Sequence, residues 1–136
     1  REGTVMEFLN VIVAALAAFA FGAVWYMSMS KAWIAAAEIP VDAKGKPQGN
    51  GGAMPFVVGL VAMVIVAGMM RHVFAMSGLA SVGQGLMGGS GIGAFLITPW
   101  VAMNYAFGMR KPALTLIDGV NSVVGCTIMG AVLNAF

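Results

Sequence analysis

The stretch "GQGLMGGSGIGAF", residues 83–95, decides the fold because its glycines fit either a phosphate-binding loop or an apolar helix. Gly83, Gly85 and Gly88 match the letters of the G-x-G-x-x-G dinucleotide-binding fingerprint. That fingerprint works only after a strand, at the start of a helix, with an acidic residue about 20 positions later. Here the residues on both sides are mostly apolar, and no acidic residue follows at that distance. The pattern therefore favours an apolar helix over a phosphate-binding loop.

Within this helix, small residues recur every four positions, at Ser81, Gly85, Gly89 and Gly93. Residues four apart lie on one face of a helix, and such small-xxx-small stripes let two membrane helices approach closely. We predict that the stripe is a helix-packing seam. A kinked or hinged segment is the alternative, because so many glycines weaken a helix. The spacing does not identify the helix against which the stripe packs.

The composition around this stretch is typical of a membrane protein. Of the 136 residues, 60% are hydrophobic and only 9% are charged, and the mean hydropathy is +0.93. Soluble domains carry about 25% charged residues, and a spanning helix needs about 20 mostly apolar ones. Four segments meet this requirement. They are residues 6–27, 54–76, 82–106 and 112–135.

The connections between these segments predict their arrangement. The longest is a polar loop at residues 28–53, whose prolines and Gly-Asn-Gly-Gly sequence break any helix after a short turn around Trp33. The other two connections are only a few residues long, so consecutive helices lie side by side and antiparallel. We therefore predict an all-α fold, a four-transmembrane-helix antiparallel bundle in one integral membrane domain.

Basic residues are distributed unequally between the two faces of this bundle. Arg1 and Arg71 share a face with both ends of the chain, and five basic residues lie on the opposite face: Lys31, Lys44, Lys46, Arg110 and Lys111. Because basic residues accumulate on the cytoplasmic side, the split favours termini in the periplasm. Met6 is itself a candidate start residue, so apart from this count of charges we base no expectation on residues 1–5.

Charged residues inside a bilayer are costly and mark functional sites by default. Arg71 falls near the face where the first helix begins, so we predict a contact with Glu7, close to Asn10. The alternative is that Arg71 reaches the lipid headgroups by itself. An ion pair with Asp118 is disfavoured by depth, since Arg71 lies about 25 Å along its helix and Asp118 about 9 Å along one that starts at the same face.

Asp118 is the centre of the only convergent polar cluster that follows from placing each residue by its depth along the four antiparallel helices. The cluster lies on the face opposite the chain ends, where three helix ends meet. It consists of Trp25, Tyr26, Trp100, Asn104, Tyr105, Asp118 and Asn121. We select five of these as the candidate polar site: Asp118, Asn104, Asn121, Tyr26 and Trp25. Asp118 is either a hydrogen-bonded pin that accepts from Asn104, Tyr26 or an indole N–H, or a proton or cation site with a raised pKa.

Other classes of function find little support in the residues. The aromatic side chains are more typical of interface anchors than of a ligand cage, and the 12 methionines of core filler than of a Cu(I) ladder. A lone His72 at a helix end is a weak candidate for a haem or chlorophyll ligand. We expect no metal site, no cofactor, no nucleic-acid binding and no enzymatic activity, because the chain has neither a basic stripe nor a nucleophile with a nearby base.

Two longer stretches resemble a known family. "FLNVIVAALAAFAFGAVWYMSMSKAW", residues 8–33, and "PWVAMNYAFGMRKPALTLIDGVNSVVGCTIMGAVL", residues 99–133, are similar to the bacterial membrane family known as domain of unknown function 1761. The likeness covers nearly the whole chain from Met6. It implies a four-helix protein of the bacterial inner membrane. The family has no established activity, substrate or catalytic residue that the resemblance would transfer.

Two functions are consistent with these observations. The first is a small non-enzymatic membrane protein that acts by helix packing, as a homo-oligomer or as an accessory subunit of a larger membrane complex. The second is a small proton-coupled transporter or channel in which Asp118 titrates, with Asn104, Asn121 and Tyr26 lining its site. In both, the lipid bilayer is the surrounding medium.

Overall fold

The computed structural model describes residues 2–49 and 51–136. Four helices in these ranges are long and apolar enough to cross a membrane, which confirms the all-α fold with four spanning helices. The four spans are α1 (Glu2–Ser28), α3 (Met54–Ser77), the continuous path of α4, η1 and α5 (Val82–Phe107), and α6 (Pro112–Leu133). The only β-structure in the described residues is a single bridge between Val41 and Pro47.

The ends of the spans follow local chemistry. Gly78, with φ of 72°, ends α3 in the left-handed conformation, and its N–H donates to the carbonyl of Phe74. Ser81 caps α4: its side chain accepts from the N–H of Gln84, while the Gln84 side chain accepts from the N–H of Ser81. Pro112 occupies the first turn of α6, where the missing N–H costs nothing. The connections on either side of the third span are therefore short, and the helices that they join are antiparallel.

The third span is interrupted by a π-helical turn. It consists of α4 (Val82–Ile92), the π turn η1 (Gly93–Ile97) and α5 (Thr98–Phe107). Pro99 lies two residues after the turn, and a proline both lacks an N–H and crowds the preceding turn, so the regular α-helical bonding cannot continue there. The Thr98 hydroxyl donates to the carbonyl of Gly93 over 2.7 Å. The interruption thus lies beside the proline, at the end of the glycine-rich stretch.

The predicted polar loop at residues 28–53 is helical in its first part. Helix α2 (Ser30–Ala37) is separated from α1 by one residue, Met29, and is capped at its C-terminal end by Glu38, which adopts a left-handed conformation with φ of 56°. Its alanines favour a helix, and Ala36 and Ala37 are buried against Leu114 and Ile117 of α6. Packing against α6 therefore stabilises a segment that is too short to be helical by itself.

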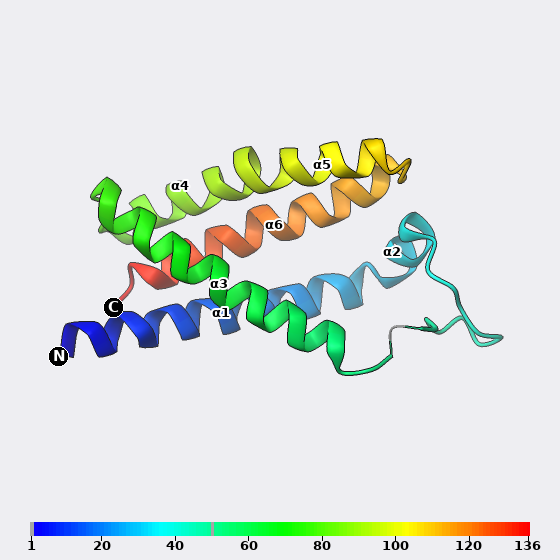
Figure 1. Ribbon diagram of the computed structural model, residues 1–136, viewed down its shortest axis with the longest axis horizontal. Helices are drawn as coiled ribbons and strands as arrows, with labels where there is room; N and C mark the ends of the chain where they lie inside the picture. The colour runs from blue at the N-terminus through cyan, green and yellow to red at the C-terminus, as the bar shows by residue number, and fades with distance from the viewer. Residues whose placement is uncertain (1, 50) are drawn as a thin grey trace.

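Helix α6 is the centre of the molecule, and every other helical segment contacts it. Figure 1 shows it in orange and red between α1 below and the α4–α5 path above, while α3 crosses the bundle obliquely. The main core contains Ala14, Ala15, Ala18, Ala67, Met70, Phe74, Cys126, Met129 and Leu133. Small residues on α1 and α6 allow these helices to lie close together.

The two ends of the bundle differ in character. Figure 1 shows both chain ends at one end of the bundle and the long loop after α2 at the other. We call these the terminal face and the loop face. Arg1, which the charge count assigned to the terminal face, lies outside the described residues.

Candidate functional site

The glycine stripe of the third span faces α6 of the same chain. A Cβ atom added at Gly85 would overlap the carbonyl of Gly130, and one added at Gly89 would overlap that of Cys126. At Gly93 an added Cβ would lie 2.6 Å from the carbonyl oxygen of Ser122. The backbones of the two helices are thus in contact along three successive turns, and the stripe is occupied within the monomer.

The spacing placed Ser81 in the same packing stripe, but its side chain does not pack against α6. Its side chain is exposed and caps α4, so it is engaged with Gln84 instead of another helix. Its backbone carbonyl accepts a 2.9 Å hydrogen bond from the Asn134 side chain at the end of α6. The four-residue spacing predicts a helical face only where the chain is helical, and Ser81 lies just before the helix begins.

Asp118 is held by two tyrosines from two other helices. The Tyr26 hydroxyl at the end of α1 donates to one carboxylate oxygen over 2.5 Å, and the Tyr105 hydroxyl of α5 donates to the other over 2.5 Å. Asp118 therefore joins α1, α5 and α6 close to the loop face. We call Asp118, Tyr26 and Tyr105 the polar cluster.

Two further candidates lie beside the polar cluster. Trp25 donates its indole N–H to the carbonyl of Ile117 over 3.0 Å, and its ring stacks on Phe21 with centroids 6.3 Å apart. Asn121 lies about one turn deeper on α6 and faces α1, since a Cβ added at Gly22 would lie 3.4 Å from its side-chain oxygen. The structure thus brings four of the five predicted residues to one region.

Of the three alternative donors that the sequence allowed for Asp118, Tyr26 makes the hydrogen bond, and Asn104 is the exception among the predicted residues. It is exposed on α5, as is Trp100, whereas the next residue, Tyr105, points to α6. Adjacent residues of a helix point about 100° apart, so orienting Tyr105 toward Asp118 turns Asn104 away. Tyr105 was part of the wider predicted cluster, but depth alone does not distinguish it from its neighbour.

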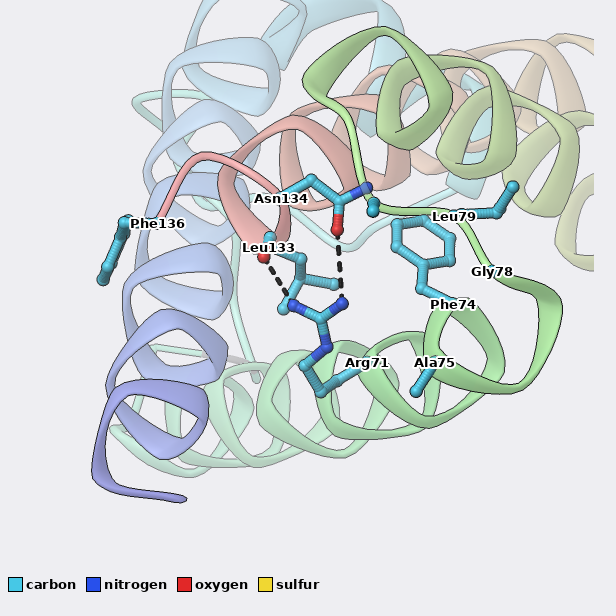
Figure 2. Close-up of a pocket in the computed structure, with 9 residues that line it drawn as sticks. Arg71, Phe74, Ala75, Gly78, Leu79, Leu133, Asn134 and Phe136 are labelled. Atoms are coloured by element: carbon cyan, nitrogen blue, oxygen red, sulfur yellow. Dashed lines mark hydrogen bonds between the residues drawn. The ribbon is translucent and has the colours of Figure 1, made fainter. Parts of the chain in front are cut away.

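The predicted contact between Glu7 and Arg71 is also replaced by another one. The Arg71 guanidinium donates to the carbonyl of Leu133 over 2.5 Å and to the side-chain oxygen of Asn134 over 3.2 Å (Figure 2). Glu7 is exposed on α1. The last carbonyls of a helix have no N–H partner within it, and they attract the guanidinium at the end of α6. Sequence spacing does not show that α6 ends beside α3.

Asn10 and His72 complete the predicted polar residues of the terminal face. Asn10 is only 2% exposed, and its amide N–H donates to the backbone oxygen of Phe136 over 3.1 Å. His72 is exposed on α3. In the part of the chain that the structure describes, no three His, Cys, Asp or Glu side chains come together as a metal site.

A crevice of about 770 Å³ adjoins the polar cluster and opens between α1, α3 and α6. The sequence pattern did not predict this crevice. Its lining residues are Ala18, Phe19, Gly22, Ala23, Tyr26, Trp33, Lys46, Pro47, Gly51, Pro55, Phe56, Gly59, Met63 and Asn121. Two aromatic pairs form part of its walls, Phe19 with Phe56 and Tyr26 with Trp33, each in an edge-to-face arrangement. The crevice exists because α3 crosses α1 obliquely, which single-helix patterns do not reveal.

The polar cluster and three complete spans, together with most of α1, lie within one region of family similarity. The family model described as protein of unknown function (DUF1761) matches residues 9–134. The chain belongs to the DUF1761 family. The matched region contains both stretches in which the sequence resembled that family, apart from Phe8. No curated protein and no solved structure shows significant similarity to this DUF1761 chain.

Proposed function

We propose that this DUF1761 protein is a non-enzymatic membrane protein that binds an amphipathic small molecule in the crevice between α1 and α3. The observation that carries the proposal is the change of polarity along the crevice. Lys46 and Tyr26 contribute polar groups toward the loop face and Asn121 contributes one halfway along, whereas the deepest lining residues are apolar. An occupant with a polar end and an apolar tail matches this change.

The depth of the crevice follows from its lining residues. Ala18 and Tyr26 both border it and lie eight residues apart on α1, which corresponds to about 12 Å along the helix. Pro55 and Met63 mark the same interval on the antiparallel α3. The crevice therefore extends from the loop face well into the apolar part of the bundle.

The volume favours a small molecule over a partner helix. Small-molecule sites measure about 300–1,000 Å³ and combine apolar walls with a few polar groups, and this crevice of about 770 Å³ has that composition. A helix is about 10–12 Å wide with its side chains and needs more room along its length. Gly59 helps to keep the walls thin, because a Cβ added there would lie 3.2 Å from the ring of Phe19.

Filling the crevice tests the proposal. Ala23 lines it and is exposed, so Ala23→Trp places an indole in the crevice without disturbing the buried core. Ala20→Trp, also at an exposed position of α1 but outside the lining, is the matched control. Protein purified in mild detergent is analysed by native mass spectrometry for retained small molecules.

We expect wild-type protein and Ala20→Trp to retain an amphipathic molecule and Ala23→Trp to lose most of it. The proposal is wrong if the wild-type protein retains none. It is also wrong if both tryptophan variants retain it equally.

Proton-coupled transport is the second candidate, and one observation favours it. Tyr26 lines the crevice and its hydroxyl also donates to Asp118, so a single hydroxyl connects the crevice with the carboxylate. In that function Asp118 would exchange protons through Tyr26, with Asn121 on the crevice wall.

A homo-oligomer or an accessory subunit, as expected from the sequence, would need an interface other than the glycine stripe. The glycine stripe, which motivated it, is engaged with α6 of the same chain. An assembly through the lipid-facing side of another helix stays a prediction. For the orientation, the excess of basic residues at the loop face supports placing that face in the cytoplasm of a bacterial cell, with the chain in the inner membrane.

A further inference from the structure

A second, smaller pocket lies at the terminal face, at the opposite end of the molecule from the crevice. It has a volume of about 290 Å³ and lies between the end of α3, the turn into α4 and the end of α6 (Figure 2). Its lining residues are Arg71, Phe74, Ala75, Gly78, Leu79, Ala80, Leu133, Asn134 and Phe136. Nothing in the proposed function uses this pocket.

The charge of Arg71 is only partly compensated by its partners. Its two hydrogen-bond acceptors are the carbonyl of Leu133 and the amide oxygen of Asn134, and both are neutral. The ends of α3 and α6 each contribute a partial negative charge of about half a unit, and the start of α4 beside the pocket contributes a partial positive one. A guanidinium has five N–H donors, and these two bonds leave others free for a ligand. The pocket therefore contains a net positive charge and spare donors.

The depth of Arg71 makes this charge significant. It lies six residues before Ser77, about 9 Å along α3 from the helix end. A cation below the headgroup layer is costly unless an anion or water reaches it. The turn at Gly78–Ala80 borders the pocket and is mostly exposed, so the pocket is accessible from the headgroup side. An anion entering by this route would lower the cost of the buried charge.

We propose that this pocket binds a phosphate group, with Arg71 as its principal ligand. Arginine is suited to phosphate because its planar donors match the oxygen geometry. The volume lies at the lower limit of small-molecule sites, so it accommodates a phosphate-sized group but not a whole lipid. The phosphate is either the headgroup of a membrane phospholipid or a free anion, and the experiment distinguishes these sources.

Arg110 is a matched control for Arg71. Its guanidinium also donates to a carbonyl at a helix end, that of Ala37 in α2, but at the loop face and outside the pocket. Arg71→Gln and Arg110→Gln therefore remove the same type of helix-end contact at opposite faces. Any loss that is specific to Arg71→Gln reports on the pocket and not on the loss of a cap in general.

The experiment measures binding by native mass spectrometry of the detergent-solubilised full chain. One series adds phosphatidylglycerol, and a second adds inorganic phosphate. We expect binding by the wild-type protein and by Arg110→Gln, and binding at least about tenfold weaker with Arg71→Gln, as for one lost charge-assisted hydrogen bond. Arg71→Lys keeps the charge and should retain part of the affinity.

A second variant keeps the proposal testable if Arg71→Gln fails to fold. Ala75→Phe fills the pocket and leaves the contacts of Arg71 with α6 in place, and Met76→Phe changes the next, exposed residue outside the lining. Loss of binding in Ala75→Phe but not in Met76→Phe supports the pocket. Binding of the lipid alone identifies a headgroup site, and binding of both probes identifies a site for phosphate in general. Equal binding by wild type, Ala75→Phe and Arg71→Gln, or no binding of either probe, overturns the proposal.

Discussion

Asp118 shows how a single residue can connect three helices. Each of its carboxylate oxygens accepts a hydrogen bond from a tyrosine hydroxyl, one from Tyr26 and one from Tyr105. Hydrogen bonds to a charged group contribute about 1.5–3 kcal/mol each. The arrangement therefore favours the first of the two roles that the sequence allowed for Asp118, a hydrogen-bonded pin that holds helices together. The same Tyr26 borders the crevice, which leaves the proton-transfer role open to a direct test.

Replacing Asp118 by asparagine separates these roles. An asparagine retains a hydrogen-bonding group at each position, so Asp118→Asn should fold, with a loss of stability of about 1 kcal/mol from the removed charge. If the protein transports protons, wild-type proteoliposomes with a pH-sensitive dye inside will show a flux that Asp118→Asn abolishes. Asp42→Asn is the control, because Asp42 lies in the loop and accepts from the backbone N–H groups of Lys44 and Lys46. Absence of flux in the wild-type protein would contradict the transport candidate.

At the scale of the element, the glycine-rich third span was predictable as a helix with a small-residue face. The partner helix was not predictable, because four-residue spacing shows which residues share a helix face but not which helix packs against that face. The structure shows α6 as the neighbour, with its own small residue Gly130 placed opposite Gly85. The sequence indicated only a short turn around Trp33 where the structure has helix α2, for a related reason: the stability of α2 comes from Leu114 and Ile117, which are distant in sequence.

The contact between the third span and α6 predicts unequal effects of alanine at two neighbouring glycines. Gly89→Ala places a methyl group into the backbone of Cys126, whereas Gly91→Ala meets nothing within 4 Å. We expect Gly89→Ala to destabilise the monomer by about 1–3 kcal/mol through overpacking. Gly91→Ala should be neutral or stabilising by up to about 1 kcal/mol, because alanine favours a helix.

Unfolding by titration with a denaturing detergent measures both variants. If Gly89→Ala instead leaves the monomer intact and dissociates an oligomer, the stripe packs against a second chain and the internal contact is wrong.

At the scale of the whole molecule, the two faces carry different features. The polar cluster and the crevice mouth lie at the loop face, and Arg71 with its pocket lies at the terminal face. Depth counting along four antiparallel helices predicted which residues share a face. It did not predict the oblique course of α3, which creates the crevice, because helix crossing depends on side chains from several elements at once.

Labelling of introduced cysteines tests the orientation. The native Cys126 is buried, so Lys44→Cys in the loop and Ser77→Cys at the end of α3 provide the exposed thiols, one on each face. With the loop face in the cytoplasm, a membrane-impermeant thiol reagent should label Ser77→Cys in intact bacterial cells and Lys44→Cys only after permeabilisation. The reverse pattern would invert the orientation, and labelling of both in intact cells would contradict their placement on opposite faces.

The sequence by itself determined the class of protein, the four spans, their antiparallel order and the face on which each polar residue lies. These follow from hydropathy, helix rise and short connections, all of which are local properties. Only the tertiary structure decided that Tyr105 and not Asn104 reaches Asp118, that Arg71 binds the end of α6 and not Glu7, and that the glycines face α6. Each of these depends on the rotation of one helix relative to another. That rotation is set by the packing of many side chains together, which a linear pattern does not encode.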